Sequence, residues 1–231
     1  MLFLVLGRGK TGSLVADVAH EHGHSVRVLG EEENPNASAL TAPFLAGFDA
    51  VIDFTTPEAV LHNLRACLAN GACVVVGTTG WYAHLEDMRA LAQRKHVGFL
   101  YGTNFSIGVQ AMLRVARELA SAAPDYKFSI TETHHADKKD APSGTALTIK
   151  HVLETANPAL EIEITSKREG DASGIHVIEA RSANDVIELR HEAFSRRGFA
   201  EGAVRAAEWI AGKSGVWQFS EIAAQVISTA R

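Results

Sequence analysis

The stretch Leu2–Gly12, LFLVLGRGKTG, indicates the fold of the first half of the chain. Its unbroken apolar run is typical of a strand that is buried on both faces of a parallel sheet. Three glycines, Gly7, Gly9 and Gly12, follow in the spacing G-x-G-x-x-G. An apolar stripe with helical spacing begins directly after them. The pattern predicts a strand, a tight glycine turn and a helix.

This turn is suited to binding a dinucleotide. Glycines let backbone N–H groups approach a pyrophosphate, and the helix N-terminus adds a partial positive charge. A second strand, SVRVLG, leads into Glu31, whose carboxylate can accept hydrogen bonds from ribose hydroxyls. This order favours a dinucleotide site over a tight turn without a ligand. The predicted cofactor contacts are Gly7, Arg8, Gly9, Lys10, Thr11, Gly12 and Glu31.

Strands and helices continue to alternate up to about residue 104. Apolar strands are predicted near residues 49–55, 72–77 and 97–106, with helices starting at Thr56-Pro57-Glu58 and near Ala83. Ligands of such sheets lie beyond the carboxyl ends of the strands. We therefore expect further cofactor contacts there, although the same residues could only cap helices and form turns. They are Gly77, Thr78, Thr79, Gly102, Thr103, Asn104 and Phe105.

The second half predicts a different architecture. A long helix after Ser106, the strand YKFSITETHH and a helix from about Ser143 to Thr155 precede three strands with alternating polarity. We expect these strands to form an antiparallel or mixed sheet with helices on one face. Two final helices should return to the nucleotide domain. The predicted fold is α/β: a Rossmann-like doubly wound parallel sheet (residues 1–104 and about 198–231) and a smaller α+β domain (105–197).

The segment Glu132–Leu147, ETHHADKKDAPSGTAL, combines charge with a helix start. The helix opened by Ser143-Gly144-Thr145 offers backbone amides to an anion. His134, His135, Lys138 and Lys139 precede it, so imidazoles and ammonium groups could meet the same ligand. The alternative is a solvated charged loop before a capped helix. Adjacent histidines of a strand point to opposite faces, so we assign no metal ligands.

Composition excludes several classes of protein. The chain has 231 residues and a net charge of −5, so nucleic acid is an unfavourable partner. Its two cysteines cannot make a disulfide framework. Its apolar runs are all shorter than a membrane span or a signal peptide requires. We expect a cytoplasmic protein.

The Glu132–Leu147 segment resembles the signature E-x-H-H-x-x-K-x-D-A-P-S-G-T-A of the dihydrodipicolinate reductase family. The stretches DFTTPEAV, GTTGW, TNFSIGV and FAEGAVRAAEWI extend the resemblance over nearly the whole chain. It implies that NADH or NADPH reduces 4-hydroxy-tetrahydrodipicolinate, a cyclic dicarboxylic imine, in the diaminopimelate and lysine pathway. It also implies that His134 is the proton donor and Lys138 a second catalytic residue. His135, Gly144 and Thr145 match substrate-binding positions.

The sequence also bears on oligomerisation and cofactor choice. The resemblance implies a tetramer built through the second sheet, where we expect Ile162, Ile164, Val177 and Ile187 to share an uncovered face. Two segments of this chain are shorter than in the family, and Lys10 replaces an arginine of its glycine loop. Glu31, Glu32 and Glu33 favour NADH, whereas Arg8 and Lys10 could pair with the 2′-phosphate of NADPH.

Two other functions agree with the first half of the sequence. An aspartate-dehydrogenase-like enzyme would share the nucleotide domain, and so would a non-catalytic sensor of NAD(H). Neither has a reason to carry both His134 and Lys138.

Overall fold

The structure, a computed structural model, describes residues 1–228. The chain divides into two units, which are treated separately below. Unit 1 contains Met1–Ile107 and the chain from Arg197 onward, and unit 2 contains Gly108–Arg196. None of the described helices is long and apolar enough to cross a membrane.

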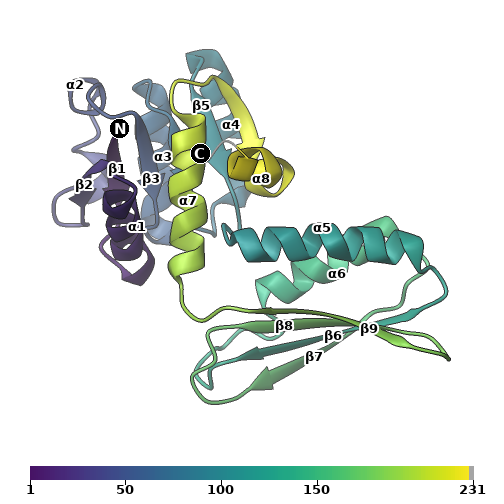
Figure 1. The fold of residues 1–231 in the computed structure, drawn as a ribbon. Coiled ribbons are helices and arrows are strands. Elements are labelled where there is room, and N and C mark those ends of the chain that lie inside the picture. Colours follow the sequence, from purple (N-terminus) through teal and green to yellow (C-terminus); the bar gives the residue numbers. More distant parts are fainter. Residues whose placement is uncertain (229–231) are drawn as a thin grey trace. The chain divides into compact units, whose positions relative to one another are not determined.

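Unit 1 is built on a six-stranded sheet in which every pairing is parallel (Figure 1). The strand order is β10-β5-β4-β3-β1-β2. The edge strand β10 was missed in the sequence because its four residues, GVWQ, are too few to show a period. The strands are β1 (Leu2–Leu6), β2 (Ser25–Leu29), β3 (Ala50–Asp53), β4 (Val74–Val76), β5 (Gly98–Tyr101) and β10 (Gly215–Gln218).

Helices cover both faces of this sheet, which confirms the doubly wound fold. Alternate residues of β1 point to opposite faces of the sheet. Phe3 and Val5 belong to one apolar cluster, and Leu4 and Leu6 belong to the other. On the first face α1 (Lys10–Glu21) lies beside α7 (Arg197–Ile210), with α8 (Phe219–Ser228) next to α7 (Figure 1). On the second face lie α3 (Pro57–Ala69) and α4 (Leu85–Lys95). Short segments are η1 (Pro35–Ala37), α2 (Ala42–Leu45) and η2 (Tyr82–His84).

Unit 2 is a four-stranded mixed sheet in the order β7-β6-β8-β9. The mixed sheet is one of the two forms expected from the sequence. A helix connects β6 to β7, and such a crossover returns the chain in the same direction, so β7 pairs parallel to β6. β6 also pairs antiparallel to β8. The elements are α5 (Ile107–Ala122), β6 (Lys127–His134), α6 (Gly144–Ala156), β7 (Glu163–Arg168), β8 (Ile175–Arg181) and β9 (Val186–Glu192).

Both helices of unit 2 pack on one face of its sheet, around Ile130 and Ile178. The expectation that Ile162, Ile164, Val177 and Ile187 share the uncovered face was wrong. Ile164 pairs with Ile130, and Ile162 is buried in the same helix-side cluster. Ile187 pairs with the buried Ala180, so it also lies on the helix side, whereas Val177 alternates to the other face.

Candidate functional site

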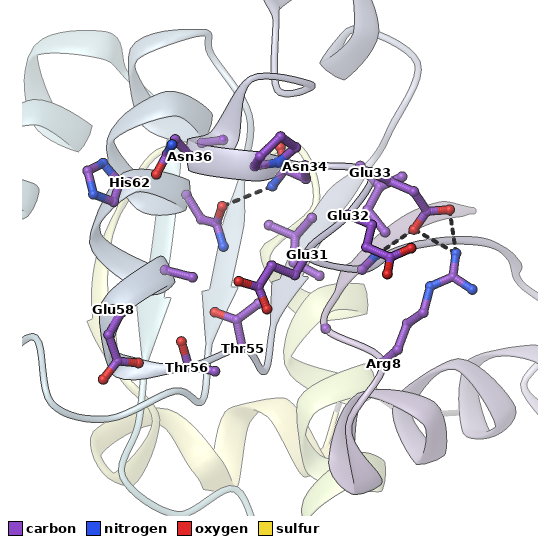
Figure 2. Close-up of a pocket in the computed structure, with 18 of the residues that line it drawn as sticks. Arg8, Glu31, Glu32, Glu33, Asn34, Asn36, Thr55, Thr56, Glu58 and His62 are labelled. Carbon is purple, nitrogen blue, oxygen red and sulfur yellow. Dashed lines mark hydrogen bonds and ion pairs between the residues drawn. The ribbon is translucent and has the colours of Figure 1, made fainter.

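In unit 1, a cleft of about 1030 Å³ opens beyond the ends of β1, β2 and β3 (Figure 2). Gly7 has a φ of +105°, and a Cβ on it would lie 2.2 Å from the carbonyl oxygen of Phe54. A Cβ on Gly12 would lie 2.1 Å from the Gly7 carbonyl oxygen. Both glycines are thus required for close packing of strand and helix. Gly9 has no atom within 4 Å of its Cβ position, so the loop is open at this residue.

The N-terminus of α1 suits a phosphate group. Gly9 occupies the N-cap position and supplies no side-chain capping bond, and the helix begins with Lys10 and Thr11. The first amides of a helix have no partner within it, and they carry the positive end of its dipole. The glycine cradle and this helix start fit the pyrophosphate of a dinucleotide.

Acidic residues line the same cleft. The Glu33 carboxylate accepts hydrogen bonds from the Gly30 amide at 2.7 Å and from Arg8 Nη2 at 2.5 and 2.7 Å (Figure 2). The Gly30 amide and then Arg8 hold the pKa of Glu33 below its ordinary value. Glu31 also lines the cleft, and no described residue pairs with its carboxylate. Glu31 is therefore available to ribose hydroxyls.

The turn after β4 is held by internal contacts. The Thr78 hydroxyl donates to Asp53 Oδ1 at 2.7 Å and accepts from the Thr55 amide at 2.8 Å. Burial raises the pKa of the Asp53 carboxyl. A Cβ on Gly77 would lie 2.2 Å from the Phe54 ring. Gly77 and Thr78 therefore shape the turn, while Thr79 is exposed.

The segment after β5 is only partly at the surface. Thr103 is exposed, and Asn104 Oδ1 accepts a hydrogen bond from the Ser106 amide at 2.9 Å. The Phe105 ring is 1% exposed and lies 4.5 Å from the Phe219 ring, between centroids. Its side chain is part of the core of unit 1. Gly102 is also buried, where a Cβ would lie 2.9 Å from Phe219 Cβ.

In unit 2, the central feature is a hydrogen-bonded pair of side chains at the end of β6. Residues two apart on a strand share a face, so Glu132 and His134 meet, and His134 Nδ1 is hydrogen-bonded to the Glu132 carboxylate. The other Glu132 oxygen accepts from Arg168 Nη1 at 3.0 Å. Glu132 is fully buried. Both of its oxygens are paired, as a buried carboxylate requires.

The surroundings lower the pKa values of both His134 and Glu132. Burial lowers the pKa of His134; the Glu132 carboxylate opposes this shift, while Lys138 and Arg168 add to it. Burial works against ionisation of Glu132, but hydrogen bonds from Ser166, Arg168 and His134 prevail and lower its pKa. His134 is thus mainly neutral near pH 7, beside an ionised carboxylate.

Arg168 also organises the predicted charged loop. Its Nε donates to the Lys138 carbonyl oxygen at 3.2 Å, and its Nη2 donates to that of Asp140 at 2.6 Å. The Lys138 ammonium group pairs with the Asp140 carboxylate at 2.7 and 2.8 Å. His135 is only half-buried, whereas His134 is buried, so the two adjacent histidines face different surroundings. Arg168 and Asp140 therefore hold the backbone and the lysine of this loop.

The start of α6 lies beside a second histidine. Ser143 is the N-cap, and its Oγ accepts from the Ala146 amide at 3.2 Å. The same Oγ lies 3.2 Å from Nε2 of His176. The His176 ring centroid is 5.2 Å from that of His134, and its Nδ1 is buried without a partner among the described residues. Burial lowers the pKa of His176 to about 4.

Gly144 and Thr145 form the first turn of this helix. Unit 2 therefore combines His134, Lys138 and a helix N-terminus, three of the features predicted for one anionic ligand.

Two contributors to this group, Glu132 and Arg168, received no role from the sequence. The same-face spacing of Glu132 and His134 was a usable signal. Arg168 was not accessible in this way because its position depends on strand register. Arg168 is the cross-strand partner of His134 on β7, and His176 is that of Glu132 on β8.

Comparison with known families gives matches over both units. The family model described as "Dihydrodipicolinate reductase, N-terminus" matches residues 1–105, and "Dihydrodipicolinate reductase, C-terminus" matches residues 108–222. A 4-hydroxy-tetrahydrodipicolinate reductase of Natronomonas pharaonis is 38% identical over 90% of this chain and 94% of its own length. One from Christiangramia forsetii is 32% identical over 96% of this chain and 97% of its own.

Solved structures include a member of the same family and more distant proteins that share the fold. A dipicolinate-bound dihydrodipicolinate reductase from Paenisporosarcina sp. TG-14 has a TM-score of 0.79 and 25% identity, covering 96% of this chain and 99% of its own. An aspartate dehydrogenase from Thermotoga maritima has a TM-score of 0.50 and 13% identity, over 92% of this chain and 97% of its own. The second similarity is one of fold alone.

Proposed function

The chain belongs to the dihydrodipicolinate reductase family, and we infer that it reduces 4-hydroxy-tetrahydrodipicolinate with NADH or NADPH in the diaminopimelate and lysine pathway. The observation that carries this inference is the pairing of His134 with buried Glu132, in the same unit as Lys138 and the N-terminus of α6. A dicarboxylate needs two anion-binding groups, and a reduced imine ring needs a proton. This unit contains residues for both tasks.

We propose the following roles for residues of unit 2. The amides at Gly144 and Thr145 bind one substrate carboxylate, and Lys138 and His135 bind the other. When bound, the reduced nicotinamide supplies a hydride to the substrate. The substrate loses its hydroxyl group as water, ring C4 accepts the hydride, and His134 donates the proton that ring C3 then requires.

Two features of His134 support its role. Its Nδ1 is held by Glu132, which leaves Nε2 to face the ligand, and Gly174 leaves room there because a Cβ on it would lie 3.1 Å from this nitrogen. A dianionic substrate raises the pKa of a nearby imidazole, which offsets the effect of burial. Glu132 stabilises the imidazolium that carries the proton.

A ligand titration tests the site independently of turnover. Dipicolinate, the planar pyridine dicarboxylate, should bind the NADH-loaded protein with a single site. Lys138→Ala should weaken this binding by about tenfold or more, since a charged hydrogen bond is worth roughly 1.5–3 kcal/mol. The exposed Lys139 provides the matched control, and Lys139→Ala should bind nearly as wild type. An NAD(H) sensor or an aspartate dehydrogenase has no reason to bind dipicolinate, so absence of binding would exclude this function.

We further propose that NADH is used at least as well as NADPH. Glu31 has an unpaired carboxylate, which binds ribose hydroxyls and repels a 2′-phosphate, and Arg8 is held by Glu33. Glu31→Ser should shift the ratio of kcat/KM values toward NADPH, whereas Glu32→Ser should change it little. An unchanged ratio in Glu31→Ser would remove Glu31 from this role.

We also propose a homotetramer located in the cytoplasm. The face of the unit 2 sheet that α5 and α6 leave uncovered supports an interface between copies. Val177 and Ile175 lie on this face, and Val186 is 47% exposed on the neighbouring strand β9.

A further inference from the structure

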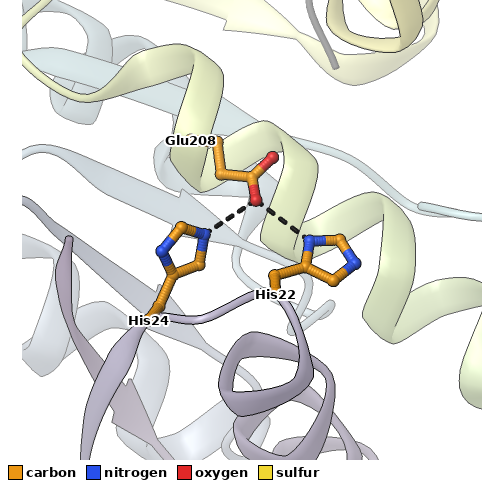
Figure 3. A group of neighbouring side chains, drawn as sticks. All are labelled: His22, His24 and Glu208. Atoms are coloured by element: carbon orange, nitrogen blue, oxygen red, sulfur yellow. Dashed lines mark hydrogen bonds and ion pairs between the residues drawn. The ribbon is translucent and has the colours of Figure 1, made fainter. Parts of the chain in front are cut away.

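Two histidines and a glutamate meet on the surface of unit 1, outside the cleft and the glycine loop (Figure 3). His22 follows α1 as its C-cap, His24 directly precedes β2, and Glu208 comes from the last turn of α7. Glu208 Oε1 lies 3.0 Å from His22 Nδ1 and 2.8 Å from His24 Nε2. The three side chains are 14–26% exposed, so they are reachable from solvent.

The spacing of these atoms suits a small cation. One ligand atom from each residue lies within 4.8 Å of the other two. Bonds of about 2.0–2.1 Å in a tetrahedron place ligand atoms about 3.3 Å apart. The observed 2.8 and 3.0 Å contacts would open by a few tenths of an ångström, and the two rings would turn toward each other. The fourth coordination position of the cation would face solvent and hold a water molecule.

The outer contacts of the cluster fix the first histidine for this purpose. His22 Nε2 lies 3.1 Å from Glu201 Oε2, on the side of the ring away from Glu208. A neutral imidazole has one N–H, so it cannot donate to both carboxylates. With a cation on Nδ1, the Nε2–H donates to Glu201, which is the carboxylate–histidine–metal arrangement of protein metal sites. Arg197 holds Glu201 in turn, at 3.0 Å.

The second histidine is also held in place. The Phe3 ring packs edge-on against the His24 ring with 4.8 Å between centroids. His24 Nδ1 lies 3.5 Å from the Met1 amino group, and His24 Nε2 faces Glu208. Arg197 is paired with Glu21 as well as Glu201, so its charge is already matched. The Glu208 carboxylate supplies a negative charge that a cation would balance.

We propose that His22 Nδ1, His24 Nε2 and Glu208 bind one divalent transition-metal ion, for which Zn²⁺ is the best match, with Glu201 orienting His22. Two imidazoles and one carboxylate are ligands that zinc readily accepts. The ion ties the turn between α1 and β2 to α7, elements that are distant in sequence. Its role is to stabilise unit 1, and it does not depend on the proposed reaction.

The test is a titration of the chelator-treated full-length protein with zinc chloride at neutral pH, followed by calorimetry, together with thermal melts. Wild type should bind one Zn²⁺ and melt at a temperature about 4–10 °C higher when saturated. Glu208→Gln retains an oxygen that can accept from both histidines but loses the anionic ligand. It should bind Zn²⁺ at least about 100-fold more weakly, and its melting temperature should not respond to zinc. Glu201→Gln should weaken binding by about tenfold.

Three further variants complete the test. His24→Gln should also lose zinc binding, while His20→Gln, at an exposed position of α1, should bind as wild type. His134→Gln removes the other histidine-containing group, formed by Glu132, His134 and His176, and it should leave the titration unchanged. Undiminished zinc binding by both Glu208→Gln and His24→Gln, or its loss in His134→Gln alone, would overturn the proposal. So would a wild-type protein that binds no zinc.

Discussion

At the scale of single residues, the proposed proton transfer depends on the two ring nitrogens of His134. One is fixed by the buried Glu132, and the other lies beside Gly174, where no side chain occupies the space. A histidine that is oriented on one side and open on the other can transfer a proton at a defined position. Lys138 is different: its ammonium group is partly exposed, and in our proposal it exchanges its partner Asp140 for a substrate carboxylate.

This division of roles predicts different kinetic defects. His134→Gln should lower kcat by about 10²–10⁴-fold with a modest change in KM, because it removes the proton donor. Lys138→Ala should affect both constants, because it removes a charge that contacts the substrate throughout the reaction. Steady-state kinetics over a range of substrate concentrations separates them. Turnover near the wild-type rate in His134→Gln would refute its assignment.

The pH profile offers a second prediction for His134. Because burial lowers its pKa and the protonated form donates, kcat/KM should decline as pH rises through a pKa below that of an ordinary histidine. Glu132 acts in the opposite direction by raising this pKa. Glu132→Gln should therefore move the alkaline limb further toward low pH. If another group were the proton donor, the alkaline limb of Glu132→Gln would coincide with that of the wild type.

For the helices and strands, some features could be predicted from the sequence and others could not. The glycine loop and the helix start at Ser143 were predicted because both are local: a few neighbouring residues set the backbone. The confirmed doubly wound fold also follows from local alternation of strands and helices. The position of β7 was not predictable in this way, because pairing with β6 depends on a crossover and on long-range register. The contribution of Arg168 was missed for the same reason.

Two glycines of the same loop should respond differently to substitution. Gly12→Ala places a Cβ 2.1 Å from the Gly7 carbonyl oxygen and should destabilise unit 1 by about 3 kcal/mol or more, since buried overpacking is costly. Gly9→Ala meets no atom within 4 Å, so its melting temperature should match wild type while KM for the dinucleotide rises. Thermal melts and steady-state kinetics measure the two effects. Equal stability of both variants would contradict the packing argument.

At the scale of the whole molecule, assembly is the main prediction. The uncovered face of the unit 2 sheet carries Ile175 and Val177, and a face of this kind is stabilised by burial against another copy. Light scattering at micromolar concentration should give about four times the 24.8 kDa chain mass. Val177→Asp, placing a charge on that face, should reduce the mass, whereas Asp137→Asn in the exposed loop should not. A wild-type species of 24.8 kDa would exclude the tetramer.

A coupled assay tests whether this chain is the reductase. A dihydrodipicolinate synthase generates the unstable substrate, and the absorbance of the reduced nicotinamide is followed after this chain is added. We predict oxidation of NADH that depends on both the synthase product and this chain, with kcat/KM at least equal to that for NADPH. No oxidation of either dinucleotide in the presence of confirmed substrate would contradict the account. A preference for NADPH of about tenfold or more, roughly 1.4 kcal/mol, would retain the reaction but reverse the assigned cofactor choice.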